Sequence, residues 1–232
     1  MKRTAPKSAS IPWQSNSTRF QDAGLRVVIP LVVTGQNVAF YPTKLVPSRA
    51  YQDWDPLAIL TRLAHERGLK VYPWIATMNS GNQRPKGILK EHPDWALRDE
   101  DSQPIGFISP GHPEGRKHVI AMIKKVVTNY KPDGVLLDYL RFHDDETALD
   151  AVSQESFDRL HPEDRFPRNG KEFRQASYAF KRQLLTELVG QISGEVRAIA
   201  PKMPIAIYMW HADGGNTRVI GQRGSSAATS IT

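Results

Sequence analysis

The sequence predicts an α/β fold, and more specifically a partial (β/α)8 TIM-type barrel of about four βα units. Apolar runs alternate with longer amphipathic segments, which is the order of elements in parallel-sheet proteins. The runs begin about 59 residues apart, so eight units would need roughly 470 residues, whereas a compact barrel takes about 250. The chain has 232 residues. No Gly-rich phosphate-binding loop follows any run, which disfavours the alternative, an open nucleotide-binding sheet.

Four apolar runs are the expected strands. The first covers residues 25–33 and is rich in Val, as buried parallel strands are. The other three cover residues 69–76, 133–141 and 203–210. Each is short and is bounded by turn-forming or charged residues, which favours a strand over a buried helix.

Three segments between these strands have the signals of helices. The first begins at Asp55, a good capping residue, and ends at Gly68. The second starts near Pro113 and repeats apolar residues at helical spacing. The third covers about 171–199 and stops before Pro201.

Two long segments, residues 77–112 and 142–170, are expected to be loops at the end of the sheet where barrel enzymes carry their function. Within the first, residues 92–106 predict a hairpin with an acidic turn. Consecutive carboxylates do not converge on one ion, so we interpret that turn as solvated. Residues 143–145 also carry atoms that could bind a metal, but they are not spaced along the chain as metal ligands are. No metal site or cofactor is therefore predicted.

Composition and charge exclude several classes of protein. There is no cysteine, which excludes disulfides and thiolate metal sites, and no apolar stretch is long enough for a membrane span. The net charge of +7 is concentrated in residues 1–26 and 214–232, so we interpret it as solvated tails and predict no nucleic-acid partner. No secretory signal is readable after Met1, which leaves the localisation unknown.

Several motifs in register resemble the glycosyl-hydrolase-like family 10 of TIM-barrel glycosidases. The matching segments read WDPLAILTRLAHERGLKVYPWIA, HPDWALRDEDSQPIG, SPGHPEGRKHVIAMIKKVV and DGVLLDYLRF, in that order. The resemblance covers about residues 25–222. It implies that the four strands are the second to fifth of the family's barrel. Residues 1–24 are then expected to be a basic disordered segment, and residues 223–232 a disordered tail.

Asp138 is the leading candidate for a catalytic residue. It ends the apolar run that begins at residue 133, at the end of the strand where barrel enzymes place their chemistry. A buried carboxylate needs a partner or a purpose, because its desolvation is costly. The resemblance implies that Asp138 is the catalytic carboxylate, as nucleophile or general base. The alternative is an ion pair with Arg141 that only orders the loop.

Glycoside cleavage needs a second carboxyl group, and the sequence leaves its identity open. Asp213 follows the fourth strand and is the natural candidate, with Trp210 nearby to raise its pKa. Its rivals follow Asp138 in the chain, namely Asp144, Asp145 and Glu146. Alternatively, Asp213 is a solvated loop residue.

Aromatic and polar residues near the strand ends are candidates for sugar binding. Aromatic faces stack on the apolar C–H faces of sugars, although any one such ring is more often core packing. His211 could donate to a sugar hydroxyl or act in proton transfer. The expected substrate-binding residues are Trp74, Tyr139, Arg141, Trp210 and His211.

The resemblance thus implies a glycoside hydrolase acting on O-glycosidic bonds of a polysaccharide, without a cofactor. The alternative is a non-catalytic carbohydrate-binding remnant, since a partial barrel need not assemble both carboxyl groups. Residues 25–33 and 203–210 would be strands with uncovered edges. We therefore expect a poorly soluble protein or a homodimer formed through these edges.

Overall fold

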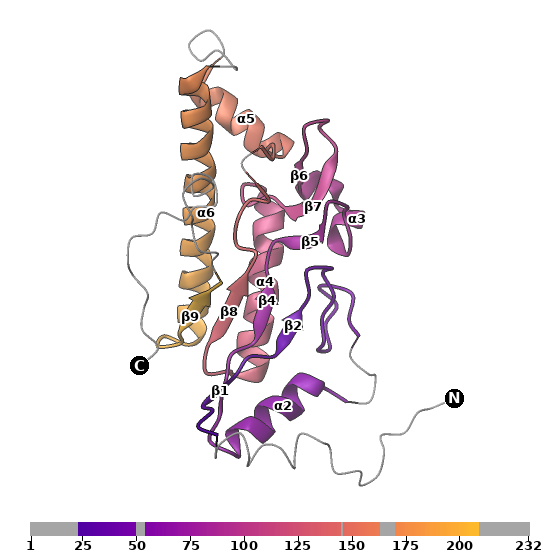
Figure 1. The fold of residues 1–232 in the computed structure, drawn as a ribbon, viewed down its shortest axis with the longest axis vertical. Coiled ribbons are helices and arrows are strands. Elements are labelled where there is room, and N and C mark those ends of the chain that lie inside the picture. Colours follow the sequence, from indigo (N-terminus) through magenta and orange to yellow (C-terminus); the bar gives the residue numbers. More distant parts are fainter. Residues whose placement is uncertain (1–22, 50–53, 145, 163–169, 209–232) are drawn as a thin grey trace, which may run out of the picture.

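The computed structural model describes residues 23–49, 54–144, 146–162 and 170–208 (Figure 1). Its centre is a parallel sheet with the strand order β2-β4-β8-β9. The strands are β2 (Leu31–Val33), β4 (Trp74–Ala76), β8 (Val135–Asp138) and β9 (Ile205–Ile207). Each lies within one of the four expected runs. The predicted α/β fold is confirmed, and over the described residues the sheet is a partial barrel that does not close.

Proline interrupts the first two expected strands. β1 (Val27–Val28) and β3 (Lys70–Val71) pair in parallel and lead into β2 and β4. Pro30 and Pro73 stand at the breaks, where they have no N–H to donate. Their carbonyl oxygens still accept hydrogen bonds, from the Trp74 and Leu136 amides at 2.8 and 3.0 Å. The expected single strands 25–33 and 69–76 are therefore two short strands each.

The three expected helices are confirmed, with bounds close to those predicted. They are α2 (Pro56–His65), α4 (Pro113–Tyr130) and α6 (Lys171–Ile199). The Asp55 carboxylate caps α2, accepting hydrogen bonds from the amides of residues 57 and 58 at 3.0 Å each. Gly68 follows α2 with a positive φ of 66°. Within the described part of the chain, no helix combines the length and apolarity needed to span a bilayer.

The two faces of the sheet differ in what covers them. α4 and α6 run along one face (Figure 1), and their buried side chains, among them Met122 and Leu188, form one core with Ile75 and Leu137. On the other face, Leu31, Trp74 and Leu136 lie side by side in register, and none of them is buried. Parallel sheets are normally covered on both faces. This face of the sheet is therefore only partly shielded in the described structure.

A small antiparallel sheet is inserted between β4 and α4. Its order is β5-β7-β6, from β5 (Asn79–Asn82), β6 (Ala96–Arg98) and β7 (Pro104–Ile108). β6 and β7 are the hairpin expected over residues 92–106, and Asp99 closes its turn by accepting the Gln103 amide at 2.8 Å. β5 was not expected, nor were the short α3 (Ile88–Glu91) and the 3-10 helix η1 (Pro93–Trp95).

The expectation that residues 142–170 are entirely loop is wrong. They contain α5 (Ala151–Leu160), which Asp150 caps by accepting the amides of residues 152 and 153. Asp150 is fully buried and also accepts hydrogen bonds from the hydroxyls of Ser109 and Ser153. A buried acid with this many donors is well satisfied. These contacts fix α5 against the segment that leads into α4.

Candidate functional site

Asp138 lies at the carboxyl end of the central strand β8, beside Ala76 of β4. Its side chain is buried, with the residue only 7% exposed. The strand ends here because the chain turns sharply: Tyr139 has a positive φ of 55°, which is strained for a residue other than glycine. The Thr77 amide and hydroxyl bind the Asp138 carbonyl oxygen at 2.9 and 2.6 Å. Thr77, which directly follows β4, therefore holds the backbone of Asp138 in place.

Two N–H groups hold the Asp138 carboxylate. The indole Nε1 of Trp74 donates to Oδ2 at 3.0 Å, and the Tyr139 amide donates to Oδ1 at 2.7 Å. Trp74 lies two register positions before Ala76, the strand partner of Asp138, so both side chains emerge from the same face of the sheet. Such donors offset part of the cost of desolvating the carboxylate. The result is a fixed carboxylate that accepts hydrogen bonds, which suits a nucleophile or general base.

Arg141 shapes the loop after Asp138. Its Nη1 donates to the carbonyl oxygens of Phe142 and His143 at 2.9 and 2.8 Å. The guanidinium also lies over the ring of Tyr139, with 5.4 Å from Cζ to the ring centroid. Burial lowers the pKa of Arg141, and the nearby Tyr139, Asp138 and Asp144 partly oppose this effect. These contacts support an ordering role for Arg141 in the loop.

Phe107 extends the site from the inserted sheet. Its ring contacts Tyr139 edge-on, with 6.1 Å between the centroids, and His143 at 5.0 Å. Arg141 also lies over it at 5.7 Å. Phe107 is fully buried, so it supports the half-buried Tyr139 from behind. The sequence reasoning missed Phe107, although its position directly after the expected hairpin of residues 92–106 was the available signal.

The structure thus brings together four of the seven expected site residues, namely Trp74, Asp138, Tyr139 and Arg141. The other three, Trp210, His211 and Asp213, lie outside the described residues.

Asp144 is a poor general acid in this structure. Burial alone would raise its pKa, but hydrogen bonds from Thr147 and His143 outweigh that effect, and the pKa lies below its ordinary value. The Thr147 hydroxyl donates to Oδ1 at 2.6 Å, and His143 Nδ1 lies 2.7 Å from Oδ2. A general acid needs the opposite shift. Asp145 lies outside the described residues, and Glu146 is exposed.

A small acidic pocket adjoins this loop. It has a volume of about 270 Å³ and is lined by the hairpin turn and the loop after β8, including Asp99, Asp101, Asp144 and Glu146. Over the described ranges, no group of three or more histidine or acidic side chains is arranged to hold a metal ion. The acidic side chains therefore line a polar edge of the site.

The chain matches one protein family and several curated proteins. The model of the family described as glycosyl hydrolase-like 10 matches residues 16–211. Glycosyl hydrolase DigH of Escherichia coli K12 is 24% identical over 199 residues, which cover 75% of this chain and 42% of DigH. The chain therefore spans less than half the length of the curated relatives it matches.

Solved structures show the same fold at low sequence identity. Alpha-L-fucosidase isoenzyme 2 from Paenibacillus thiaminolyticus superposes with a TM-score of 0.68 and 19% identity, over 88% of this chain and 30% of that one. An alpha-galactosidase from Lactobacillus brevis gives a TM-score of 0.50 and 14% identity, over 83% and 24% of the two chains. The described sheet and helices thus correspond to part of a TIM-barrel-like glycosidase fold.

Proposed function

The chain belongs to the glycosyl hydrolase-like 10 family, and from that premise we propose that it carries a catalytic carboxylate of a glycoside hydrolase. The proposed reaction is cleavage of O-glycosidic bonds in a polysaccharide, with Asp138 as nucleophile or general base. The observation that supports this most is the buried Asp138 carboxylate, which the Trp74 indole and the Tyr139 amide hold at the carboxyl end of β8. The half-buried rings of Trp74 and Tyr139 would face the sugar.

A second carboxyl group is still required. We propose Asp213 as this second carboxyl group, the general acid, and Trp210 and His211 as further sugar-binding residues. The lowered pKa of Asp144 makes that residue the weaker rival. The acid would protonate the leaving glycosidic oxygen while Asp138 acts on the opposite side of the anomeric carbon.

Asp138→Asn tests the proposal, with Asp133→Asn as a matched control. Asp133 precedes the opposite end of β8, where its Oδ2 lies 2.8 Å from both the Val71 amide and His65 Nε2. We expect Asp138→Asn to reduce the release of reducing ends from polysaccharide by about 10³-fold while leaving the fold intact. Asp133→Asn should lower stability and leave the rate per folded molecule within a few-fold of the wild type.

The alternative is a carbohydrate-binding protein without catalysis, and the same assay separates the two. If the wild type is retained on insoluble polysaccharide but releases no reducing ends, the hydrolase proposal fails for this chain and the binding alternative stands. If Asp138→Asn releases reducing ends as fast as the wild type, Asp138 is not the catalytic carboxylate.

We also propose that the chain by itself associates with a second copy. β2 and β9 are the outer strands of the parallel sheet. The apolar Leu31, on the partly shielded face, is 39% exposed. Uncovered strand edges and apolar sheet faces favour pairing with another chain.

A further inference from the structure

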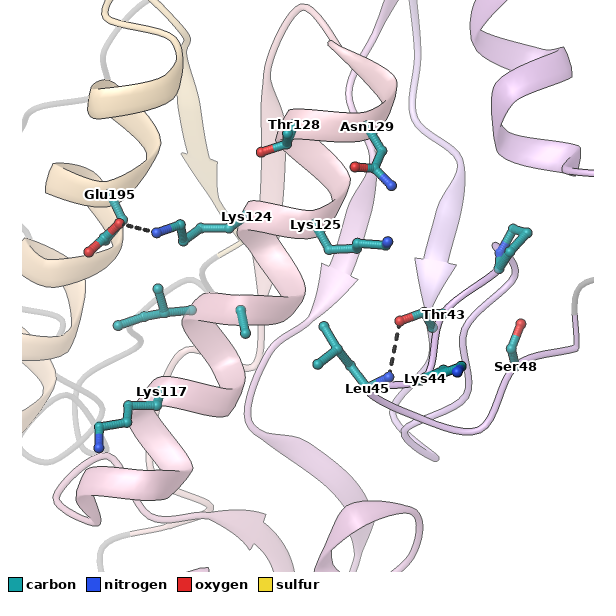
Figure 2. A pocket seen from close by; sticks show the side chains of 13 residues that line it. Thr43, Lys44, Leu45, Ser48, Lys117, Lys124, Lys125, Thr128, Asn129 and Glu195 are labelled. Carbon is teal, nitrogen blue, oxygen red and sulfur yellow. Dashed lines mark hydrogen bonds and ion pairs between the residues drawn. The ribbon is translucent and has the colours of Figure 1, made fainter.

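A long groove lies on the outside of the helical layer and shares no residue with the Asp138 site (Figure 2). Its volume is about 1080 Å³. One wall is α4, the other is the loop 42–48, and Glu195 of α6 closes one side. The lining residues are Pro42, Thr43, Lys44, Leu45, Ser48, Lys117, Ile120, Ala121, Lys124, Lys125, Thr128, Asn129 and Glu195.

The groove follows the axis of α4. Seven lining residues lie on this helix, between Lys117 and Asn129, and they recur at intervals of three or four. They therefore occupy one face of more than three turns, which at 1.5 Å per residue is about 18 Å long. A path of this shape fits a linear segment better than a compact small molecule.

The groove has an excess of positive charge. Four of its lining residues are lysines and only Glu195 is acidic. Glu195 forms an ion pair with Lys124, and Lys117 pairs with Glu114, which lies outside the groove. Within the part of the chain that the structure describes, Lys44 and Lys125 have no acidic partner. Lys125 extends from α4 toward the loop that carries Thr43 (Figure 2).

The floor between these lysines is apolar and contains Leu45, Ile120 and Ala121. None of the lining residues is aromatic, so the groove lacks the rings on which sugars stack. An amphipathic helix, in contrast, lays an apolar stripe into such a groove and places charged residues along its two flanks.

We propose that this groove of α4 and the loop 42–48 docks an acidic amphipathic helix of a partner protein. The apolar stripe of that helix packs on Leu45, Ile120 and Ala121, and its carboxylates pair with Lys44 and Lys125. This docking surface is independent of the glycosidase proposal, because it uses neither Asp138 nor the sugar-binding residues.

Fluorescence anisotropy with a labelled synthetic helix tests the docking. The probe is an amphipathic peptide of about 18 residues with a Leu stripe and Glu on both flanks, and a matched peptide carries Lys in place of Glu. We expect the Glu peptide to bind at least about tenfold more tightly than the Lys peptide. The double variant Lys44→Glu/Lys125→Glu should weaken binding of the Glu peptide by at least about tenfold.

The control variant is Lys90→Glu/Lys202→Glu, which makes the same charge change at two exposed positions outside the groove. It should bind the Glu peptide within about twofold of the wild type, and circular dichroism checks that both variants fold. Equal weakening by the control, no saturable binding, or a preference for the Lys peptide would overturn the proposal. Binding of an acidic oligogalacturonate but not of the Glu peptide would assign the groove to an anionic glycan instead.

Discussion

At the scale of single residues, the contact between Trp74 and Asp138 does most to define the site. The two residues come from neighbouring strands, and the indole N–H donates to the carboxylate over 3.0 Å. Asp138 is buried, so each donor that it keeps is worth more than the same donor at a surface. The indole thus both orients the carboxylate and presents a ring beside it.

Trp74→Phe removes this donor and keeps an aromatic ring. We expect the rate of glycan cleavage to fall by about 10- to 100-fold, and the free energy of unfolding to fall by about 1–2 kcal/mol, because a hydrogen bond to a charged group is lost. Trp95→Phe is the control. The Trp95 ring stacks on His92, with 4.1 Å between the ring centroids, and its other ring contacts are with His112 and His118. Initial rates and urea denaturation measure the two effects. An unchanged rate in Trp74→Phe would show that the indole N–H does not position Asp138 for the reaction.

His118 predicts how stability depends on pH. Burial, with a smaller effect from His92, lowers the pKa of His118 from 6.5 to about 4. Its Nε2 is buried and has no hydrogen-bond partner within the described structure. The unfolded chain therefore binds a proton at this residue between pH 6.5 and 4, where the folded chain does not. The contribution of neutral His118 to the free energy of unfolding is fully present above pH 6.5. It should fall by about 3 kcal/mol as the pH drops from 6.5 to 4.

His118→Leu isolates this contribution, because it removes the titrating group and keeps an apolar side chain of similar size. Urea denaturation at pH 7 and pH 4 should show a smaller loss of stability in the variant, by about 2–3 kcal/mol. Parallel pH profiles of wild type and variant would contradict the assignment.

At the scale of elements, Asp55 links two helices. Its Oδ1 caps α2, and its Oδ2 accepts the Tyr130 hydroxyl at the end of α4 at 2.6 Å. Burial, followed by this hydrogen bond and the charge of Asp55, raises the pKa of Tyr130. One carboxylate therefore completes α2 and attaches it to α4.

Asp55→Ala should lower the free energy of unfolding by about 2–3 kcal/mol, since it removes a helix cap and leaves the Tyr130 hydroxyl without its acceptor. Tyr130→Phe should lower the free energy of unfolding by about 1 kcal/mol. The double variant should cost less than the sum of the two, by at least about 0.5 kcal/mol, because the two residues interact directly. Strict additivity in urea denaturation would argue against the contact.

The main elements could be predicted because their signals are local. Short apolar runs marked the strands, Asp55 and Pro113 marked the starts of two helices, and Gly68 marked the end of one. β5 has the sequence Asn-Ser-Gly-Asn and owes its strand conformation to pairing with β7, a contact that no local pattern reveals. α5 had a signal that was overlooked, namely a capping residue at Asp150.

The site was predictable in part for the same reason. The order of the strands was enough to predict which residues lie near strand ends, namely Trp74, Asp138 and Tyr139. The carbonyl contacts of Arg141 and the support from Phe107 depend on how the inserted sheet packs on the loop after β8. Such packing involves residues far apart in the sequence, so composition and spacing did not reveal it.

At the scale of the whole molecule, the sheet is covered by helices on one face and partly open on the other. The open face carries Leu31, Trp74 and Leu136 in register. In the TIM-barrel fold the corresponding face is the packed interior of the barrel. In the described part of the chain, the open face of the sheet therefore exposes apolar side chains of the kind that fill the core of a barrel.

Leu31→Lys tests the association proposed for the isolated chain. We expect the wild type to be dimeric or poorly soluble, and the variant to shift toward monomer, because a charge on the open face opposes its burial. Leu160→Lys on α5 is the control, since Leu160 is 61% exposed and lies away from the sheet. Light scattering at several concentrations gives the mass. A monodisperse wild-type monomer would contradict the proposal.

The most direct test of the central claim, that Asp138 supplies the reacting carboxylate, is chemical rescue of Asp138→Ala. The variant leaves space where the carboxylate stood, and formate can enter that space as a substitute carboxylate. Release of reducing ends from polysaccharide should fall by at least about 10³-fold and should partly recover with added formate. Cleavage by Asp138→Ala at the wild-type rate, without formate, would contradict the claim.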